Sequence, residues 1–280
     1  MSWQGQLNMD KRVILITGVS SGIGKAFVRK ALSSSGDEVV VVGIGRNNSR
    51  ELKDKRYIFI KTDLSNFSSI KHSFGKLREN IGKVDVLINN AGFAYRGTIE
   101  DLSPDEIMEQ FDVNLIGPMY LTSLVLPLMR KQRSGHIINI SSVASVVSTP
   151  TLGYYAATKA SMDKVSEVLE QEVKKFNIKV SILIPGAVKT NFGKHIKIPR
   201  NYPRTHYKTL YEEWIKRFEY FFHIKNSPED IANSLWGLIK KPQRTKYINI
   251  RDYIMCSAKK YLPYRIFHFF FLNYFYNYEG

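Results

Sequence analysis

The six residues YYAATK (154–159) contain a tyrosine and a lysine whose spacing could place them on one face of a helix. Each residue of an α-helix advances by about 100°, so Tyr155 lies about 40° from Lys159, whereas Tyr154 points about 140° away. An ammonium group near a phenol favours the phenolate, and we expect Lys159 to lower the pKa of Tyr155 from about 10. Such a tyrosine could exchange a proton with a carbonyl or an alcohol near neutral pH. Taken alone, the pair also describes a packed ring beside a solvated amine.

A glycine-rich turn, TGVSSGIG (17–24), follows the first apolar run and precedes a helical pattern. Glycines at positions 18, 22 and 24 let the backbone turn sharply and let a pyrophosphate approach the amides at a helix N-terminus. A Walker loop is disfavoured, because Lys25 is followed by Ala26 and the glycine spacing differs. A turn without a ligand is the competing interpretation.

The end of the second apolar run, GIGRN, indicates which dinucleotide would bind. An acidic residue near this position favours NAD, whereas an arginine accommodates the 2′-phosphate of NADP. Here Gly45 and Arg46 take this position, and Arg50 could share the role. NADP(H) is therefore favoured over NAD(H), unless Arg46 is only a surface residue. The fourth run leads into NNAG (89–92), whose small side chains suit the close passage of a cofactor.

Two kinds of apolar segment alternate along the chain, and they predict an α/β fold with a seven-stranded, doubly wound parallel sheet of the Rossmann type and helices on both faces. Short β-branched runs predict buried strands at 13–17, 38–44, 57–61, 84–89, 136–141, 179–185 and 246–250. Helical spacing predicts helices at 23–32, 67–79, 104–129, 155–176 and 228–239. Ser-Pro pairs at 103–104 and 227–228 give two of these helices clear start signals.

Taken together, the motifs resemble the short-chain dehydrogenase/reductase family, and most closely its 17β-hydroxysteroid and retinol dehydrogenase-like branch. The resemblance covers about residues 11 to 190 and rests on a set of motifs in the family's order and spacing: Thr17-Gly18-x-x-x-Gly22-x-Gly24, Asp63, Asn89-Asn90-Ala91-Gly92, Asn114, Ser142, Tyr155-x-x-x-Lys159, and Pro185-Gly186 followed by Thr190. It implies an NAD(P)-dependent oxidoreductase that interconverts a carbonyl and an alcohol by hydride transfer.

The resemblance also implies roles for single residues. Tyr155 would be the general acid/base, Lys159 would lower its pKa and bind the nicotinamide ribose, Ser142 would hold the substrate oxygen, and Asn114 would steady a water in the proton relay. Ser141 is the neighbouring candidate, but along a strand end it should face the other way. The implied cofactor-binding residues are Thr17, Gly18, Ser20, Ser21, Gly22, Ile23, Gly24, Arg46, Asp63, Leu64, Asn90, Ala91, Gly92, Tyr155, Lys159, Pro185, Gly186, Val188 and Thr190.

Length and composition are those of one globular domain spanning residues 1–280, with 44% hydrophobic and 24% charged residues. The single cysteine, Cys256, cannot form an internal disulfide and lacks metal-binding partners, which fits a reducing compartment. The N-terminus has no apolar core of signal-peptide length. We therefore expect a cytoplasmic protein without a metal, and peripheral contact with a membrane surface remains the alternative.

The net charge of +16 concentrates toward the C-terminus, where 16 Lys and Arg stand against 7 Asp and Glu from Lys194 onward. No nucleic-acid-binding signature accompanies this excess, so we expect no nucleic-acid partner. A solvated face and a face toward anionic lipid headgroups remain open. From the resemblance, a homodimer or homotetramer is expected.

Two aromatic segments bear on the substrate. Residues 187–227 interrupt the strand–helix alternation and are rich in aromatic residues. The resemblance implies that this segment forms a lid over the substrate, and its aromatic content suits a hydrophobic, steroid, retinoid or lipid-like compound. Helix core or an oligomer contact would explain the same aromatics, and a 3-oxoacyl-type or general carbonyl reductase is the alternative activity. The basic and aromatic tail, 259–280, is too interrupted for a membrane span, so it either packs on the fold or lies in a membrane interface. A non-catalytic NADP(H)-sensing or membrane-associated protein is the alternative of another class.

Overall fold

Seven parallel strands form the central sheet of the computed structural model, which describes residues 11–34, 36, 38–49, 51–189, 196–202, 206–212 and 226–269. They run in the order β3-β2-β1-β4-β6-β7-β9, and every neighbouring pair is parallel. The strands are β1 (Arg12–Thr17), β2 (Val39–Gly45), β3 (Tyr57–Lys61), β4 (Val86–Asn89), β6 (Gly135–Ile140), β7 (Ile178–Ile184) and β9 (Thr245–Tyr247). The predicted seven-stranded parallel sheet is confirmed.

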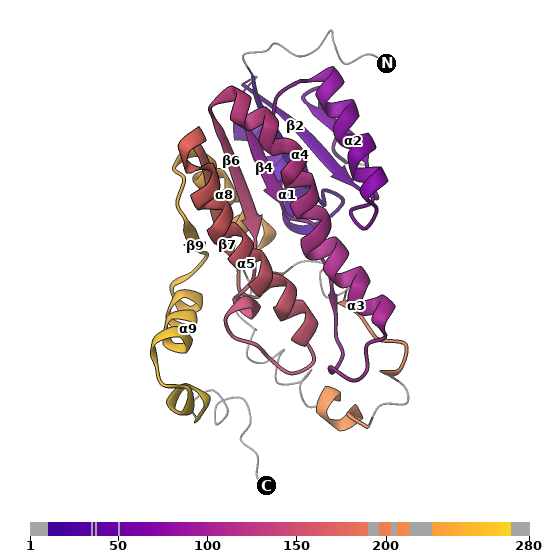
Figure 1. The fold of residues 1–280 in the computed structure, drawn as a ribbon, viewed down its shortest axis with the longest axis vertical. Helices are drawn as coiled ribbons and strands as arrows, with labels where there is room; N and C mark the ends of the chain where they lie inside the picture. Colours follow the sequence, from indigo (N-terminus) through magenta and orange to yellow (C-terminus); the bar gives the residue numbers. More distant parts are fainter. Residues whose placement is uncertain are drawn as a thin grey trace.

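Helices cover both faces of this sheet, as predicted (Figure 1). One face packs against α1 (Gly22–Ser34) and α8 (Pro228–Lys240). The other face packs against α2 (Phe67–Asn80), α4 (Gly117–Gln132) and α5 (Gly153–Val173), after which a 3₁₀ turn, η4 (Lys174–Phe176), continues the chain. Strands enclosed in this way are apolar on both faces, which explains their near-continuous β-branched sequences.

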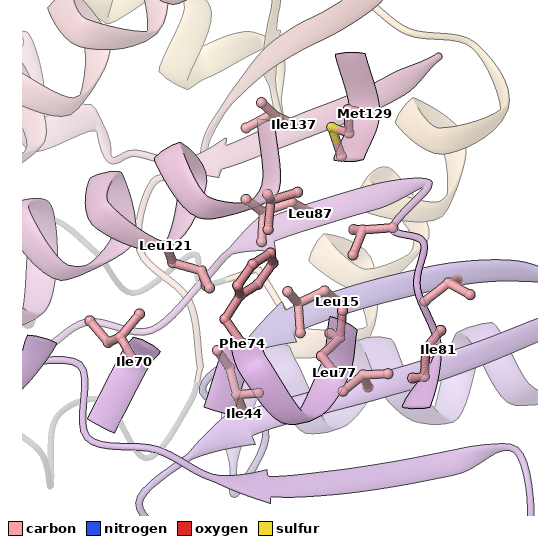
Figure 2. Packing of buried hydrophobic residues seen from close by; sticks show 14 of the residues in the cluster. Leu15, Ile44, Ile70, Phe74, Leu77, Ile81, Leu87, Leu121, Met129 and Ile137 are labelled. Atoms are coloured by element: carbon pink, nitrogen blue, oxygen red, sulfur yellow. The ribbon is translucent and has the colours of Figure 1, made fainter. Parts of the chain in front are cut away.

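The core on the α2–α4 side shows how the layers meet (Figure 2). Phe74 and Leu77 of α2 lie against Leu15 of β1 and Leu87 of β4, while Leu121 approaches from α4. All five side chains are at most 9% exposed. Burial of this kind contributes on the order of 2 kcal/mol for each large side chain, so the layers hold the carboxyl ends of the strands in a fixed arrangement.

The predicted helix over 104–129 contains a change of helical type. It consists of α3 (Pro104–Phe111), a π-helical turn, η2 (Asp112–Ile116), and α4. Pro118 lacks an N–H group and cannot return a hydrogen bond to the preceding turn, which favours a local change in the helix. Gly117 also packs closely, because a Cβ atom there would lie 2.0 Å from the Leu64 carbonyl oxygen. The π-turn displays Asn114 toward the end of the sheet.

This helical run, Pro104–Gln132, is long and apolar enough by composition to cross a membrane, with a mean hydropathy of 1.3 over its best window. A core helix passes the same test, and the buried Leu121, Val125 and Met129 of α4 belong to the core. Composition alone therefore does not assign this run to a membrane, and one side of it contributes to the core.

The C-terminal elements differ most from the prediction. The strand predicted over 246–250 ends at Tyr247, because the Asn249 side chain accepts a hydrogen bond from the Asp252 amide (2.8 Å) and caps α9 (Ile250–Tyr261). Two further strands, β5 (Ala94–Tyr95) and β8 (Ile196–Lys197), form a small parallel sheet that was not predicted. It ties the segment after β7 to the end of β4.

Candidate active site

Tyr155 and Lys159 lie on one face of α5, as their spacing predicted. The Lys159 Nζ atom is 5.9 Å from the centroid of the Tyr155 ring. Tyr154 points elsewhere: its ring packs against Phe93 and Leu102, and its hydroxyl lies 3.4 Å from the Ile99 carbonyl oxygen. Helical phase therefore separates the two tyrosines into one that faces the sheet edge and one that packs in a side cluster.

Ser142 meets Tyr155 from the end of β6. The two hydroxyls are hydrogen-bonded, and this bond acts to lower the pKa of Tyr155. The Ser142 hydroxyl also accepts a hydrogen bond from the Ala144 amide (3.1 Å), which starts the 3₁₀ turn η3 (Val143–Ser145). Ser141 faces the other way, with its hydroxyl beside the Asp163 carboxylate. The alternation expected of a strand end assigns Ser142 to the site.

Lys159 is buried, with 5% of its surface exposed. Its ammonium donates a hydrogen bond to the Ile140 carbonyl oxygen (2.8 Å). Burial lowers the pKa of Lys159 to about 8, and the charge of Asp163, one turn further along α5, acts to raise it. The amine is therefore held in one place at the end of β6 and is protonated below about pH 8.

The expected lowering of the Tyr155 pKa is wrong for this geometry. Burial of the phenol raises the pKa of Tyr155 to about 12, and the hydrogen bond from Ser142 only partly offsets this effect. Exclusion of water penalises the phenolate more than nearby polar groups stabilise it. At neutral pH the tyrosine thus carries its proton, which suits it to protonate a substrate oxygen.

Both polar atoms of the Asn114 side chain form hydrogen bonds with neighbouring residues. Its side-chain oxygen accepts a hydrogen bond from the Phe93 amide (3.0 Å), and its side-chain nitrogen donates to the Phe93 carbonyl (2.8 Å) and the Thr158 hydroxyl (3.3 Å). The residue is 1% exposed. A Cβ atom on Gly92 would lie 3.2 Å from the Asn114 oxygen and 3.7 Å from the Lys159 Nζ atom. Asn114 therefore joins the end of β4 to α5 beside Lys159.

The glycine-rich turn has the backbone that its sequence predicted. Gly18 has a φ of +75° and Gly22 one of +54°, values that favour glycine. A Cβ atom on Gly24 would lie 2.1 Å from the Gly18 carbonyl oxygen, so the turn closes on itself at the start of α1. Such a turn leaves backbone amides at a helix N-terminus available to a phosphate group.

Thr17 and Asn90 fix this turn against the end of β4. The Thr17 hydroxyl accepts hydrogen bonds from the amides of Asn90 (2.9 Å) and Ala91 (2.8 Å). The Asn90 side chain donates to the carbonyls of Thr17 (2.8 Å) and Gly18 (3.0 Å). The two motifs, 73 residues apart in sequence, thus form one rigid edge.

The other residues expected to bind a cofactor lie along the same carboxyl ends of strands. Ser20 is exposed, whereas Ser21 and Ile23 are half-buried at the start of α1. Arg46 follows β2 and is exposed. Asp63 follows β3, but one of its carboxylate oxygens accepts hydrogen bonds from the Ser65 amide (3.0 Å) and hydroxyl (2.8 Å).

The next residue, Leu64, is a buried member of the core. Its exposed fraction is 5%. Its side chain packs in the core, and its carbonyl oxygen lies against Gly117, so the structure gives no side-chain role in cofactor binding to Leu64.

The segment after β7 is connected to the C-terminal helix by a contact that the sequence did not predict. Pro185 is buried, and the Gly186 amide donates a hydrogen bond to the Asp252 carboxylate (3.1 Å). Val188 bridges to Asn226. A carboxylate in the first turn of a capped helix was the only sequence signal for Asp252. Thr190 and Arg50 lie outside the described residues.

Comparison with known proteins adds to this geometry. The model of the short chain dehydrogenase family matches residues 12–200. The chain belongs to this family. It is an NAD(P)-dependent oxidoreductase by this membership, and the predicted family is confirmed.

Particular relatives cover nearly the whole chain. A 3-ketodihydrosphingosine reductase of Bacteroides thetaiotaomicron is 32% identical over 259 residues, covering 91% of this chain and 94% of its own. A short-chain dehydrogenase structure from Streptomyces avermitilis superposes with a TM-score of 0.78 at 29% identity, covering 90% and 93% of the two chains. A serine dehydrogenase structure with NADP+ has a TM-score of 0.70 at 25% identity, covering 84% and 93%.

The residues present fit a nicotinamide dinucleotide. The cradle at Gly18 and Gly24 has no room for side chains but leaves space for a phosphate at the α1 N-terminus. Lys159 and Gly92 lie at the far end of the same edge, beside Tyr155 and Ser142. The turn at Gly18 and the group around Tyr155 thus lie at the same carboxyl end of the sheet, where they would hold such a cofactor.

Of the aromatic residues expected in a lid over 187–227, some belong to the described part of the chain and others do not. Tyr211 is fully buried, and its hydroxyl donates to the Asp101 carboxylate (2.6 Å) and accepts from the Thr98 amide (2.8 Å). Its ring meets that of Tyr202 edge to face. Tyr211 is therefore core rather than pocket wall, which supports the packing interpretation at this position. Phe192, Trp214, Phe218, Phe221 and Phe222 lie outside the described residues.

Proposed function

We propose that the protein is an NADP(H)-dependent reductase of a hydrophobic, lipid-like ketone, with Tyr155 as the proton donor. The observation that carries this proposal is the hydrogen bond between Tyr155 and Ser142 beside the buried Lys159. A non-catalytic nucleotide-binding protein has no need for these three groups at one point of the sheet edge.

The mechanism assigns one role to each side chain. A bound nicotinamide cofactor supplies the hydride to the carbonyl carbon. Ser142 donates a hydrogen bond to the carbonyl oxygen and orients it. Tyr155, protonated at neutral pH, gives its proton to this oxygen as negative charge develops, so that the product is the alcohol. Lys159 stabilises the resulting phenolate, and Asn114 keeps the α5 edge in place.

The preference for NADP(H) rests on Arg46. Its exposed side chain follows β2, where it can reach a 2′-phosphate, and no acidic residue occupies this position to bind a free ribose hydroxyl. Similar structures have been solved with NADP+ and with NAD, so these structures do not favour either cofactor. The preference for NADP(H) is therefore supported by Arg46 alone. Reduction is the favoured direction with NADPH and with a protonated tyrosine.

The substrate class rests on a relative. The 3-ketodihydrosphingosine reductase is named for a keto lipid, and its alignment spans 91% of this chain. We extend this class of substrate to the present protein. A general carbonyl reductase would accept small ketones equally well.

An assay of NADPH oxidation tests the proposal. We expect turnover with 3-ketodihydrosphingosine or another long-chain ketone, and much slower turnover with acetone or a small aldehyde. NADH at the same concentration should support a lower kcat/KM. Turnover with NADH alone would contradict the role of Arg46, and equal rates with small and long-chain ketones would contradict the lipid-like substrate.

We also propose that the protein forms a homodimer through α4 and α5. Val165 and Val168 are 40% and 54% exposed and, with Leu126 and Met119, line a hollow between the two helices. Such an apolar strip on two adjacent long helices suits a symmetric contact with a second copy. Sedimentation equilibrium of the wild type against Val168→Glu would test the contact, since the charge should yield monomers.

A further inference from the structure

The C-terminal part of the described chain carries an unusual amount of exposed apolar surface. Eight of the fifteen large hydrophobic side chains exposed in the described part of the chain lie between residues 250 and 269. On α9, Ile250, Tyr253, Ile254 and Tyr261 are 50–75% exposed and share one face by their helical spacing. Tyr264 and Phe269, which follow the helix, are each 62% exposed as well.

The opposite face of α9 is attached to the fold. Cys256 packs with Val143 and Ile184, and the Asp252 carboxylate accepts the hydrogen bond from Gly186. Because the helix is held against the fold on one side, its other face is exposed in the folded protein. Figure 1 shows α9 at the outer edge of the fold, beyond β9.

Basic groups accompany the exposed rings. Residues 250–269 contain Arg251, Lys259, Lys260 and Arg265, and their only carboxylate, Asp252, is buried. The Lys259 Nζ atom lies 4.7 Å from the centroid of the Tyr264 ring. The Lys260 Nζ atom lies 5.5 Å from that of Tyr261. Aromatic rings next to cations are typical of the interface between lipid headgroups and acyl chains.

We propose that α9 and residues 262–269 form a surface that lies flat on an anionic phospholipid bilayer. The 12-residue helix is too short to cross a bilayer, which takes about 20 residues, but its apolar face can enter the headgroup region while the lysines meet lipid phosphates. The positive charge favours this occupant over a second copy, whose identical lysines would repel each other.

The surface also has a defined relation to the proposed active site. Val143, which packs under α9 with Cys256, directly follows Ser142, and Gly186, which is bonded to Asp252 of α9, lies just after the carboxyl end of β7. Docking would thus bring this edge of the site close to the bilayer. The membrane inference does not depend on the proposed substrate, since it rests on α9 alone.

Co-sedimentation of the full chain with vesicles tests the inference. We expect binding to phosphatidylcholine vesicles that contain phosphatidylserine, weaker binding at high salt, and little binding to phosphatidylcholine alone. Lys259→Glu with Lys260→Glu should weaken binding about tenfold or more, since each basic residue contributes on the order of 1 kcal/mol. Lys174→Glu with Lys175→Glu, which makes the same charge change on exposed residues after α5, should leave binding unchanged.

A pair of variants at apolar residues tests whether the side chains of α9 insert into the bilayer or whether charge attraction alone accounts for binding. Ile254→Ser should weaken vesicle binding several-fold, whereas Met108→Ser, at a side chain of similar exposure (55% against 58%) on α3, should not. Thermal unfolding of each variant verifies that it folds, and Lys259→Gln with Lys260→Gln replaces the Glu pair if that pair does not. Unchanged binding of the α9 variants would overturn the proposal. So would equal binding to neutral vesicles, or a loss of dimers instead of a loss of vesicle binding.

Discussion

Lys159 and Asp163 lie one turn apart on α5, and each opposes the effect of burial on the other. Burial lowers the pKa of Lys159 to about 8, while the charge of Asp163 acts to raise it. Burial likewise raises the pKa of Asp163, while the charge of Lys159 and the hydroxyls of Ser141 and Ser145 act to lower it. The carboxylate thus helps to keep the ammonium charged beside Tyr155.

Replacing Asp163 by Asn should shift the pH dependence of catalysis. Without the carboxylate, the pKa of Lys159 falls further, and the ammonium is lost at lower pH. We expect the alkaline limb of the kcat/KM profile to move to lower pH, with about a tenfold loss for each pH unit beyond the limb. Glu79→Gln, which removes a carboxylate from an exposed position of α2, is the matched control. A profile that does not move would assign Asp163 a purely structural role.

Replacing Tyr155 by Phe should abolish turnover and leave cofactor binding largely intact. The variant loses the donated proton and one hydrogen bond to Ser142, which costs about 1 kcal/mol of stability. Fluorescence titration with NADPH and steady-state kinetics measure the two effects. Tyr154→Phe, with its hydroxyl 3.4 Å from the Ile99 carbonyl, should retain most activity. Full activity in Tyr155→Phe would refute the assignment.

Replacing Arg46 by Asp should reverse the cofactor preference. The carboxylate would repel a 2′-phosphate and could accept a hydrogen bond from a free ribose hydroxyl. We expect KM for NADPH to rise on the order of tenfold or more, since a charge-assisted contact contributes about 1.5–3 kcal/mol, while KM for NADH falls. Lys71→Asp, an equal charge change on the exposed side of α2, controls for general electrostatics. A parallel rise for both cofactors would show that Arg46 does not discriminate between them.

His136 should make the fold sensitive to acid. Burial lowers the pKa of this residue from 6.5 to about 4, and its Nε2 atom lies 2.8 Å from the Ser181 hydroxyl. Between these two values the unfolded chain binds a proton that the folded chain does not, so stability falls as the pH drops from 6.5 to 4. The difference corresponds to at most about 3 kcal/mol.

Urea unfolding at pH 7.5 and 4.5 measures this effect. His136→Asn should be less stable at pH 7.5 but should lose less stability than the wild type on acidification. His72→Asn, an exposed histidine on α2, should behave as the wild type does. Equal pH dependence in all three proteins would mean that His136 is not held neutral.

Much of the fold follows from local pattern. Strands such as Val39–Gly45 are rich in β-branched residues, and a Ser-x-x-Glu box with a proline marks the start of α3 at Ser103. The π-turn around Asn114 was missed because its causes act together: Pro118 lacks a donor, and Gly117 meets the Leu64 carbonyl, which is distant in sequence. The start of α9 was missed because Ile250, its first residue, was included in the strand predicted over 246–250.

By itself, the sequence determined which residues could reach one another along a single element. Helical phase selects Tyr155 over Tyr154 as the partner of Lys159, strand alternation selects Ser142 over Ser141, and glycine spacing selects the turn at Gly18. Only the tertiary structure decided the pKa values of Tyr155 and Lys159 and the contacts that hold the ends of the strands in place. Packing buries Lys159 and half-buries Tyr155, which shifts the pKa of each group, and it brings Asp252 to Gly186 across 66 residues. Spacing sets angles within an element, whereas solvent exclusion and contacts between elements depend on how the whole chain packs.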